Sequence, residues 1–304
     1  MLSIMLIIVT ILTVILSILL PPLYDGIHRK IKARIHCRIG PPIIQTWYDL
    51  IKLFGKTDIS PNISSKLYSY APYLAFSYLL VALLITPFIY IRSIFSFTCD
   101  LIVLLYLLSS ASVFLVLGGF SSGNVFAYEG ARRELMIIIL TELTVIFSIT
   151  ALAVRYSSLM ITDIYRAIVV NYPSISSIVS SIAIVLCGYI EGCRFPFELS
   201  EAEPEIAGGI VIEYSGKRLA LFKLSVLIKQ FILVSLAVDI IEPWSLFLIP
   251  LNIPVFIVKT LIVYVIYAFI DPLFGRYRVF ESLKTLFIFY SLAVLSLIFA
   301  VLRV

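Results

Sequence analysis

Charged residues are scarce in this sequence. Lysine, arginine, aspartate and glutamate make up only 13% of its 304 residues, whereas 61% are hydrophobic and the mean hydropathy is +1.09. A water-soluble protein needs a polar surface, and so few charges cannot supply one for a chain of this length. The composition therefore excludes a soluble globular protein and indicates a polytopic membrane protein.

Metal ligands and nucleotide-binding motifs are also scarce. No two cysteines are spaced as in CxxC, and both histidines lie in one basic segment, so we expect no zinc site, iron–sulfur cluster or haem in this chain. No GxGxxG or Walker A sequence is present, which argues against a nucleotide site. The cysteines are Cys37, Cys99, Cys187 and Cys193, and the histidines are His28 and His36.

Long apolar runs predict eight membrane-spanning helices. The first run, MLSIMLIIVTILTVILSILL, lacks the basic start and small-residue cleavage site of a signal peptide, so we expect it to be retained as a helix. We predict an all-α polytopic membrane protein with one domain, residues 1–304. The expected spans are 2–23, 70–91, 97–118, 134–154, 174–192, 219–241, 245–270 and 282–302, and the loops expected on one side are 24–69, 119–133, 193–218 and 271–281.

Lysines and arginines are divided unevenly between the two sets of loops. Most of them follow the first, third, fifth and seventh spans, whereas the other side holds only Arg92, Arg155, Arg166 and Arg303. The positive-inside rule then predicts that the basic loops are cytoplasmic and that both termini lie outside. We expect a multi-pass protein of the plasma membrane. Topology accounts for the net charge of +5, so no nucleic-acid partner is expected.

The first basic loop contains two amphipathic segments separated by Gly40-Pro41-Pro42. An isoleucine recurs every four residues from Ile27 to Ile39, which indicates that the first helix extends into the membrane interface. Beyond the break, the apolar residues of 43–54 follow helical spacing, which predicts a helix lying along the membrane. Two interpretations of that helix stay open: a simple membrane anchor, or a docking face that forms one wall of a cavity.

The stretch FPFELSEAEPE at 195–205 concentrates acidic residues in an apolar chain. Ser200 and Glu203 have the spacing of a capping box, and Pro204 fits only near a helix start. Glu201 and Glu205 would then face the same side, where like charges repel and partial burial raises a carboxyl pKa. Such groups can take up and release protons. The alternative is a solvated loop whose acids only cap a helix.

Ionisable residues inside the expected spans are the second unusual feature. Glu142, Lys229 and Lys259 each fall near the middle of a span, where a charge is costly and therefore indicates function. Glu129, Glu134 and Glu142 form a ladder that runs from the cytoplasmic side into the membrane, with the last two on roughly one helix face. We expect this ladder and the acidic loop to form the entrance of an ion path. For the lysines, the alternatives are snorkelling or a structural ion pair.

Two long segments resemble a known family. RIGPPIIQTWYDLIKLFGKTDISP at 38–61 resembles the first cytoplasmic loop of the membrane subunit at the heel of respiratory complex I, the NADH dehydrogenase subunit 1 or H type. EGCRFPFELSEAEPEIAGGIVIEYSGKRLALF at 191–222 is similar to its signature Glu-x-x-Arg-x-Pro-Phe-Asp-Leu-x-Glu-Ala-Glu-x-Glu, which is followed by Glu-Tyr-Ser. The resemblance covers essentially the whole chain.

Other details resemble one branch of that superfamily. Gly40-Pro41-Pro42 with Tyr48-Asp49-Leu50, and GARREL at 130–135, are similar to the homologous subunit of group 4 energy-converting membrane-bound [NiFe]-hydrogenases and related sulfur-reducing complexes. The chain departs from the family pattern at Thr46, at Thr57-Asp58 and at Leu143, where proline, Lys-Glu and proline are frequent.

The resemblance implies a membrane-anchoring subunit that couples a redox event in a docked, ferredoxin-linked arm to movement of H⁺ or Na⁺. It implies a [NiFe]-hydrogenase-like large subunit carrying a [NiFe] centre, an iron–sulfur small subunit carrying iron–sulfur clusters, antiporter-like membrane subunits, and no catalytic residue in this chain. The coupling residues expected are Glu129, Glu134, Glu142, Glu191, Arg194, Glu198, Glu201, Glu203, Glu205, Glu213, Lys229 and Lys259. The docking residues expected are Arg38, Asp49, Lys52, Arg132, Arg133, Arg276 and Arg278.

Three other functions stay open at this point. The same fold could reduce quinone in a long cavity under the interfacial helix. An autonomous ion transporter would be expected to show inverted repeats or broken helices, and no repeat is evident in the sequence. An inert scaffold would tolerate neutralisation of Glu142 and Glu201 without any change in ion movement.

Overall fold

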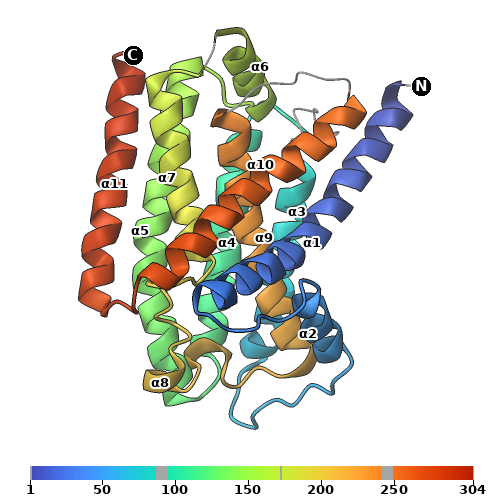
Figure 1. Cartoon of the computed structure of the whole chain (residues 1–304), viewed down its shortest axis with the longest axis vertical. Coiled ribbons are helices and arrows are strands. Elements are labelled where there is room, and N and C mark those ends of the chain that lie inside the picture. The colour runs from blue at the N-terminus through green and yellow to red at the C-terminus, as the bar shows by residue number, and fades with distance from the viewer. Residues whose placement is uncertain (1, 87–94, 172, 242–248, 304) are drawn as a thin grey trace.

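The chain is described by a computed structural model that covers residues 2–86, 95–171, 173–241 and 249–303. Throughout these residues the regular elements are helical (Figure 1). The α-helices are α1 (Leu2–Ile35), α2 (Gln45–Phe54), α3 (Lys66–Ile85), α4 (Asp100–Phe120), α5 (Val125–Tyr156), α6 (Ile161–Asn171), α7 (Ile175–Glu191), α8 (Glu203–Ile206), α9 (Gly216–Ile241), α10 (Ile249–Ile270) and α11 (Val279–Val301), and the short 3₁₀ helices are η2 (Gly209–Val211) and η3 (Asp271–Leu273).

The expected membrane spans are confirmed as helices. Among the described residues, α1, α3, α4, α5, α9, α10 and α11 are long and apolar enough to cross a membrane. The fifth expected span corresponds to α7, which is apolar but has only 17 residues. The chain is therefore an all-α, multi-pass membrane protein. Positions 87–91 and 245–248 of the expected spans, and Arg92, lie outside the described residues.

Helix α9 forms the centre of the bundle. It packs against α7, α3, α1, α2 and α10, and its side chains are buried on every face, including Ile228, Phe231 and Ile232. Helices α3, α4, α5 and α7 stand roughly parallel to it, and α11 packs on α5 and α7, while α1 and α10 cross the bundle obliquely (Figure 1). A helix with an apolar surface all round belongs in a core position, which explains why α9 is central.

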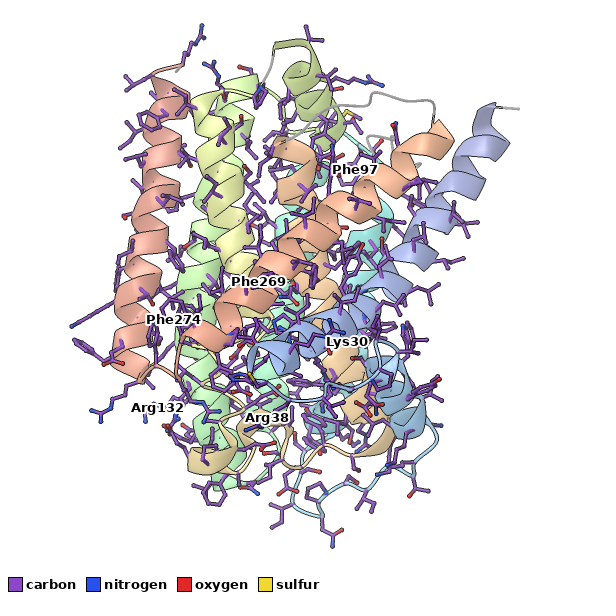
Figure 2. All side chains as sticks on the ribbon, in the orientation of Figure 1. Lys30, Arg38, Phe97, Arg132, Phe269 and Phe274 are labelled. Atoms are coloured by element: carbon purple, nitrogen blue, oxygen red, sulfur yellow. The ribbon has the colours of Figure 1, made fainter. Side chains whose placement is uncertain are left out.

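The two ends of the bundle differ. Both termini and α6 lie at one end, and α2 and α8 lie at the other (Figure 1). Figure 2 shows Lys30, Arg38 and Arg132 toward the end that holds α2 and α8, with Phe97 toward the opposite end. The basic loops grouped by the positive-inside rule thus lie at one end of the molecule, as their alternation along the chain predicts.

Several boundaries differ from the expected ones. Helix α1 continues to Ile35, so the basic segment with an isoleucine at every fourth position is helical up to that residue. The chain then breaks at Gly40-Pro41-Pro42 before α2 begins. The loop expected at 119–133 is helical from Val125 onward, so its acidic and basic residues extend α5 beyond the apolar core. Helix α6 was not predicted from the sequence. The Asp100 carboxylate accepts a hydrogen bond from the backbone N–H of Ile161 at 2.9 Å and so satisfies one free donor at its start.

The segment that precedes α3 is tied to the start of α9. Asp58 accepts a 2.6 Å hydrogen bond from the backbone N–H of Lys217, and the Ser215 hydroxyl donates to the Ile59 carbonyl at 3.0 Å. An acidic side chain at a helix N-terminus satisfies a free N–H and interacts favourably with the helix dipole. The departure from the family pattern at Thr57-Asp58 therefore has a structural explanation.

A close approach of backbones seats α2 against α1. Helix α2 buries Thr46 and Leu50 on the side that faces α1 and α9. Gly26 of α1 lies so near the chain before α2 that a Cβ atom there would come within 1.8 Å of the Ile43 carbonyl oxygen. Only glycine permits this contact without a backbone shift.

We expect Gly26→Ala to displace α2 and to lower the stability of the folded chain by about 1–3 kcal/mol, the usual cost of overpacking. Thermal unfolding of the purified full-length protein in detergent measures this. Gly55→Ala is the control, since a Cβ atom at Gly55 meets its nearest atoms at 3.7 Å. Equal melting temperatures for the two variants would contradict the expectation.

Candidate ion-coupling site

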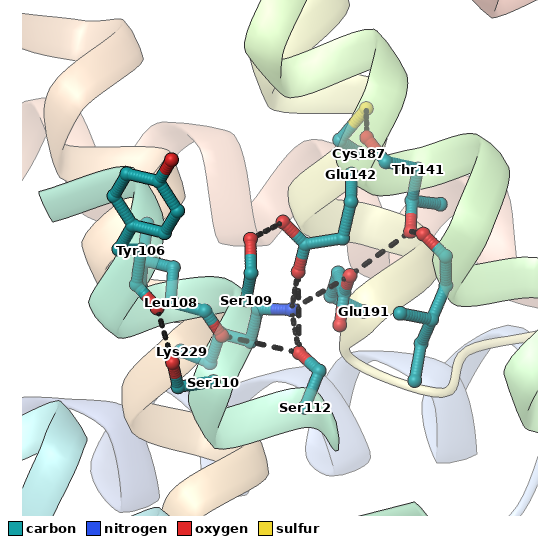
Figure 3. Close-up of polar contacts among 11 residues, drawn as sticks. Tyr106, Leu108, Ser109, Ser110, Ser112, Thr141, Glu142, Cys187, Glu191 and Lys229 are labelled. Carbon is teal, nitrogen blue, oxygen red and sulfur yellow. Dashed lines mark hydrogen bonds and ion pairs between the residues drawn. The ribbon is translucent and has the colours of Figure 1, made fainter. Parts of the chain in front are cut away.

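A lysine and two glutamates from three helices meet inside the bundle. The Lys229 ammonium on α9 lies 2.8 Å from Glu142 Oε1 on α5 and 2.8 Å from Glu191 Oε1 at the end of α7 (Figure 3). The side chains of Lys229 and Glu191 are 5% and 7% exposed. Buried charges persist when they are paired, so this coupling triad, Lys229, Glu142 and Glu191, satisfies its members mutually.

Hydroxyl groups from α4 and α5 complete the triad. Ser109 donates to Glu142 Oε2 at 2.6 Å, and Ser112 donates to Glu142 Oε1 at 3.3 Å and accepts a hydrogen bond from Lys229. Thr141 donates to Glu191 Oε1 at 3.0 Å. Figure 3 shows the Ser112 hydroxyl next to the lysine nitrogen and the Ser109 and Thr141 hydroxyls on the two carboxylates. A hydroxyl both donates and accepts, so each of these groups can pass a proton along a hydrogen-bonded chain.

A small cavity connects the triad to the acidic loop. Its volume is about 30 Å³, enough for one or two water molecules. Its polar lining consists of Ser112, Glu134, Glu191, Cys193, Ser200, Glu201 and Lys229, and its apolar lining of Leu115, Ile138, Ile210, Phe222 and Val226. The inner cavity therefore brings side chains of the membrane interior and of the 192–205 loop to one space.

A wider cavity lies beside the first, under α2. It has a volume of about 230 Å³ and shares Cys193, Glu201 and Val226 with the inner cavity. The remaining lining residues are Asp25, Arg29, Thr46, Asp49, Leu50, Leu53, Gly192, Arg194, Glu198, Lys223 and Leu227. Glu201 and Cys193 thus stand between this outer cavity and the inner one.

A second charge network holds the 192–205 loop in place. Asp25 of α1 accepts hydrogen bonds from Arg194 at 2.6 Å and from Thr46 at 2.9 Å, and it pairs with Arg29 at 2.8 Å. Close by, Asp271 pairs with Lys32 at 2.9 Å and accepts from the backbone N–H of Phe195 at 3.1 Å. Ion pairs and hydrogen bonds to Asp25 and Asp271 therefore join the loop to helices α1, α2 and η3.

Comparison with known proteins identifies the family. The family model described as NADH dehydrogenase matches residues 5–302. The chain belongs to the NADH dehydrogenase family. Hydrogenase-4 component C of Escherichia coli (strain K12) is 33% identical over 282 residues, which cover 90% of this chain and 89% of that protein. The sequence resemblance to the subunit 1 or H type is thereby confirmed.

Further relatives agree with this assignment. Formate hydrogenlyase subunit 4 of Escherichia coli (strain K12) is 32% identical over 222 residues, covering 72% of each chain. Among solved structures, a chain of the membrane-bound sulfane sulfur reductase, an archaeal respiratory membrane complex, aligns with a TM-score of 0.85 and 24% identity over 97% of this chain and 99% of that one. The last likeness establishes the fold of this family member.

The structure brings together only part of the residue set expected from the sequence. Seven of the expected coupling and docking residues line one or both cavities: Glu134, Glu191, Arg194, Glu198, Glu201, Lys229 and Asp49. Glu142 joins them through Lys229. Four expected coupling acids lie elsewhere: Glu205 pairs with Arg133 at 2.6 Å, Glu129 lies 3.7 Å from Arg132 and from Arg133, Glu213 accepts a hydrogen bond from Asn124, and Glu203 is exposed.

The remaining expected residues are peripheral to both cavities. Lys259 lies on α10, where its charge acts on Asp239 of α9. Arg38, Lys52 and Arg132 are exposed. Arg276 pairs with Glu198 at 2.8 Å, and Arg278 takes the N-cap position of α11. The coupling and docking roles of all these residues stay predictions.

The capping box expected at Ser200 is wrong. Helix α8 covers only Glu203–Ile206, and its N-cap residue is Ala202, without a side-chain cap. Glu201 therefore lies outside the helix that holds Glu205, and the two carboxylates do not share a face of one helix. The Ser200 hydroxyl lines the inner cavity instead, together with Glu134.

Sequence reasoning missed the groups that fix the loop and complete the triad. Asp25, His28 and Asp271 are buried, yet in the sequence they stand among basic residues that indicate a solvated surface. Ser109 and Ser112 are spaced three apart in a mostly apolar span, which places them on one helix face. That spacing was the available signal for a polar site on α4.

Electrostatics in the 192–205 loop differ from those of a solvated surface. Burial is the largest influence on Glu201 and raises its pKa; the Lys223 ammonium opposes this shift, and the Glu198 and Glu203 carboxylates add to it. Burial also raises the pKa of the Cys193 thiol. Glu201 is therefore easier to protonate in the folded protein than in the unfolded chain.

This shift predicts how stability depends on pH. Folding raises the pKa of Glu201 above its ordinary value of 4.5. At pH values just above 4.5 the carboxyl group therefore stays protonated in the folded protein, whereas it loses its proton in the unfolded chain. The stabilisation from that proton is present below about pH 4.5 and is lost as the pH rises through the folded pKa. The Glu201→Gln side chain does not titrate, so this variant should not lose stability in this way. The difference in melting temperature between Glu201→Gln and the wild type should therefore be larger at pH 8 than at pH 5. Glu201→Asp keeps a titrating carboxyl and should follow the wild type; a Glu201→Gln profile parallel to the wild type would contradict the prediction.

Removal of Arg194 should destabilise the protein strongly. Its loss leaves Asp25, whose side chain is only 4% exposed, with less charge compensation. Breaking a buried ion pair by deleting one partner costs about 3–5 kcal/mol. Arg194→Ala should therefore lower the unfolding free energy far more than Arg132→Ala, which removes an exposed pair worth about 0–1 kcal/mol. Comparable losses in denaturant unfolding would show that the network does not hold the loop.

Proposed function

We propose that this chain is the membrane-anchoring and ion-coupling subunit of an energy-converting redox complex of the hydrogenase type. Its similarity to hydrogenase-4 component C and to formate hydrogenlyase subunit 4 extends over most of their lengths, and each of these relatives is named as one part of a larger assembly. This supports a subunit role over an autonomous transporter. The chain would link electron transfer in a docked arm to ion movement through the membrane.

The observation that carries the proposal is the continuity from loop to triad. The outer cavity meets the inner cavity at Glu201 and Cys193, and the inner cavity reaches Glu134, Glu191 and Lys229. Glu142 follows at 2.8 Å from the lysine. A proton entering beside Lys223 and Glu201 has a series of carboxylates and hydroxyls ahead of it, with room for water between them.

The 192–205 loop would convert an event in the partner into an event at the triad. Arg194 and Glu198 hold the loop by ion pairs to Asp25 and Arg276, at 2.6 Å and 2.8 Å. A partner that shifts the loop by breaking either pair would move Glu201 relative to the inner cavity. Such a shift would change both the solvation and the charge surroundings of Glu201, which together set its affinity for a proton.

The partners would dock at the end of the bundle that holds α2 and α8. Exposed basic residues there include Arg38, Lys52 and Arg132, and the outer face of α2 exposes Tyr48 and Ile51. The partners proposed on this face are a [NiFe]-hydrogenase-like large subunit and an iron–sulfur small subunit, which would carry the [NiFe] centre and the iron–sulfur clusters. Antiporter-like subunits would lie alongside in the bilayer.

The proposed location is the plasma membrane with both termini outside. Support comes from the two termini at one end of the bundle and the basic loops at the other (Figures 1 and 2). This orientation directs α2, α8 and the mouth of the outer cavity toward the cytoplasm, where a ferredoxin-linked arm would bind.

A quinone-reducing role is less well supported. The outer cavity has about 230 Å³, whereas sites for drug-sized ligands usually have about 300–1,000 Å³ and a mostly apolar lining. Here half of the lining residues are acidic or basic, among them Asp25, Arg29, Asp49 and Arg194. A lipophilic ring would gain little by replacing water in such a space.

Neutralising the path should uncouple the complex. We expect Glu142→Gln and Glu201→Gln to reduce redox-driven ion uptake by membrane vesicles at least tenfold, because each removes a group that carries the ion. The electron-transfer rate measured with an ionophore present should change much less, since no redox centre is altered. Ion uptake and substrate turnover are measured in the same vesicles to make this comparison.

Asp163→Asn on α6 is the matched control, because it removes an exposed carboxylate at the opposite end of the bundle, where Asp163 lies 3.7 Å from Arg166. It should keep wild-type ion uptake. If Glu142→Gln and Glu201→Gln behave like Asp163→Asn, the chain is an inert scaffold and the proposed function is wrong.

A further inference from the structure

The ammonium group of Lys229 occupies the place between the two carboxylates where a bound metal cation would lie. We propose that Lys229 makes this site selective for protons and excludes Na⁺, so that removal of the lysine creates a sodium site between Glu142 and Glu191. The inference rests on the proposed function only in taking the triad as part of an ion path. It adds the identity of the ion and the residue that determines it.

The first support is the occupancy of the carboxylate oxygens. Lys229 lies 2.8 Å from Oε1 of both Glu142 and Glu191. Ser109 takes Glu142 Oε2 at 2.6 Å, and Thr141 takes Glu191 Oε1 at 3.0 Å. Three of the four carboxylate oxygens thus already accept hydrogen bonds from this chain. A sodium ion needs several oxygen lone pairs at once, and here donors hold most of them.

The second support is charge. Lys229 is tethered to α9, and its chain neighbours in the core, Ile228 and Ile232, are fully buried. A sodium ion that approached the same oxygens would stand beside an ammonium of equal charge in a medium that screens poorly. The lysine has little room to withdraw, because its side chain is only 5% exposed and α9 is surrounded by other helices. Repulsion therefore acts against every metal cation at this position.

The third support is space. The inner cavity of about 30 Å³ holds one or two water molecules, so a sodium ion would have to enter without its hydration shell. The groups facing the triad from the surrounding elements are Ser109 and Ser112 on α4, Thr141 on α5, Cys187 on α7 and Glu134, Ser200 and Glu201 around the cavity. Ser109 donates its hydrogen to Glu142, and the Ser112 oxygen already accepts a hydrogen bond from Lys229, so neither hydroxyl offers a metal cation a free position.

A proton meets none of these obstacles. It binds a carboxylate oxygen without needing further ligands, and it can travel through a single water molecule or through the Ser112 hydroxyl, which accepts from Lys229 and donates to Glu142. The same geometry that shuts out sodium therefore leaves proton transfer open.

The test compares sodium binding by the purified full-length chain with and without the lysine. Melting temperatures are measured in detergent at pH 8 in NaCl and in choline chloride of equal concentration, because a ligand that binds only the folded state raises the melting temperature. The wild type should melt at the same temperature in both salts. Lys229→Gln and Lys229→Ala should melt about 2 °C or more higher in NaCl than in choline chloride. Lys229→Arg keeps a cation and should stay insensitive, as should the exposed Lys66→Gln.

Two outcomes would overturn the inference. One is a higher melting temperature of the wild type in NaCl than in choline chloride, if Glu142→Gln abolishes the difference. Binding of radioactive sodium by the wild type, also abolished by Glu142→Gln, would count in the same way. These measurements do not require any lysine variant to fold. The other is that Lys229→Gln and Lys229→Ala fold but melt at the same temperature in NaCl and in choline chloride. Failure of the proposed function gives a different result, unchanged ion uptake in Glu142→Gln vesicles, which the isolated chain does not report.

Discussion

A lysine inside hydrocarbon must be paired, and this requirement organises the centre of the molecule. Lys229 lies on the most buried helix and finds Glu142 on α5 and Glu191 on α7, each at 2.8 Å. The three helices must therefore converge at one depth, and α4 must present its serine face to the same point. Loss of the lysine would leave two buried carboxylates without their counter-charge, a defect that usually costs about 3–5 kcal/mol.

The second charge network links the surroundings of the triad to the end of the bundle that holds α2 and α8. Asp25 joins α1 to Arg194 in the loop and to Thr46 in α2, so the wall of the outer cavity and the loop between the cavities share one anchor. Because Glu191 ends α7 and Arg194 follows three residues later, movement of the loop pulls directly on one member of the triad. One short stretch of chain thus joins the second charge network to the triad.

The sequence allowed the fold class, the spans and the intramembrane charges to be predicted, because hydrophobic runs and isolated charges are local signals. Glu142 and Lys229 were expected from their positions alone. Their pairing with Glu191 was not, since contacts between helices leave no period in the sequence. From the sequence, Glu129 and Glu205 were also expected to belong to the ion path. In the structure both lie next to Arg133 and outside the two cavities. Helical spacing of the buried residues Ile161, Ile164, Tyr165 and Ile168 was the sequence signal for helix α6. The segment was not predicted, because it is too short and too polar to be recognised as a membrane span.

Stability alone does not explain the triad. Replacement of a buried ion pair by well-packed apolar residues of similar volume is often neutral or stabilising, so a bundle selected only for rigidity has no need of Lys229. A scaffold also has no need of a water-sized cavity beside the triad, since an unfilled space removes packing contacts. Both features are costs for an anchor and requirements for a relay, because a proton needs titratable groups and water between them. The cavity and the charges occur at the same place, next to the 192–205 loop at the end of the bundle that holds α2 and α8.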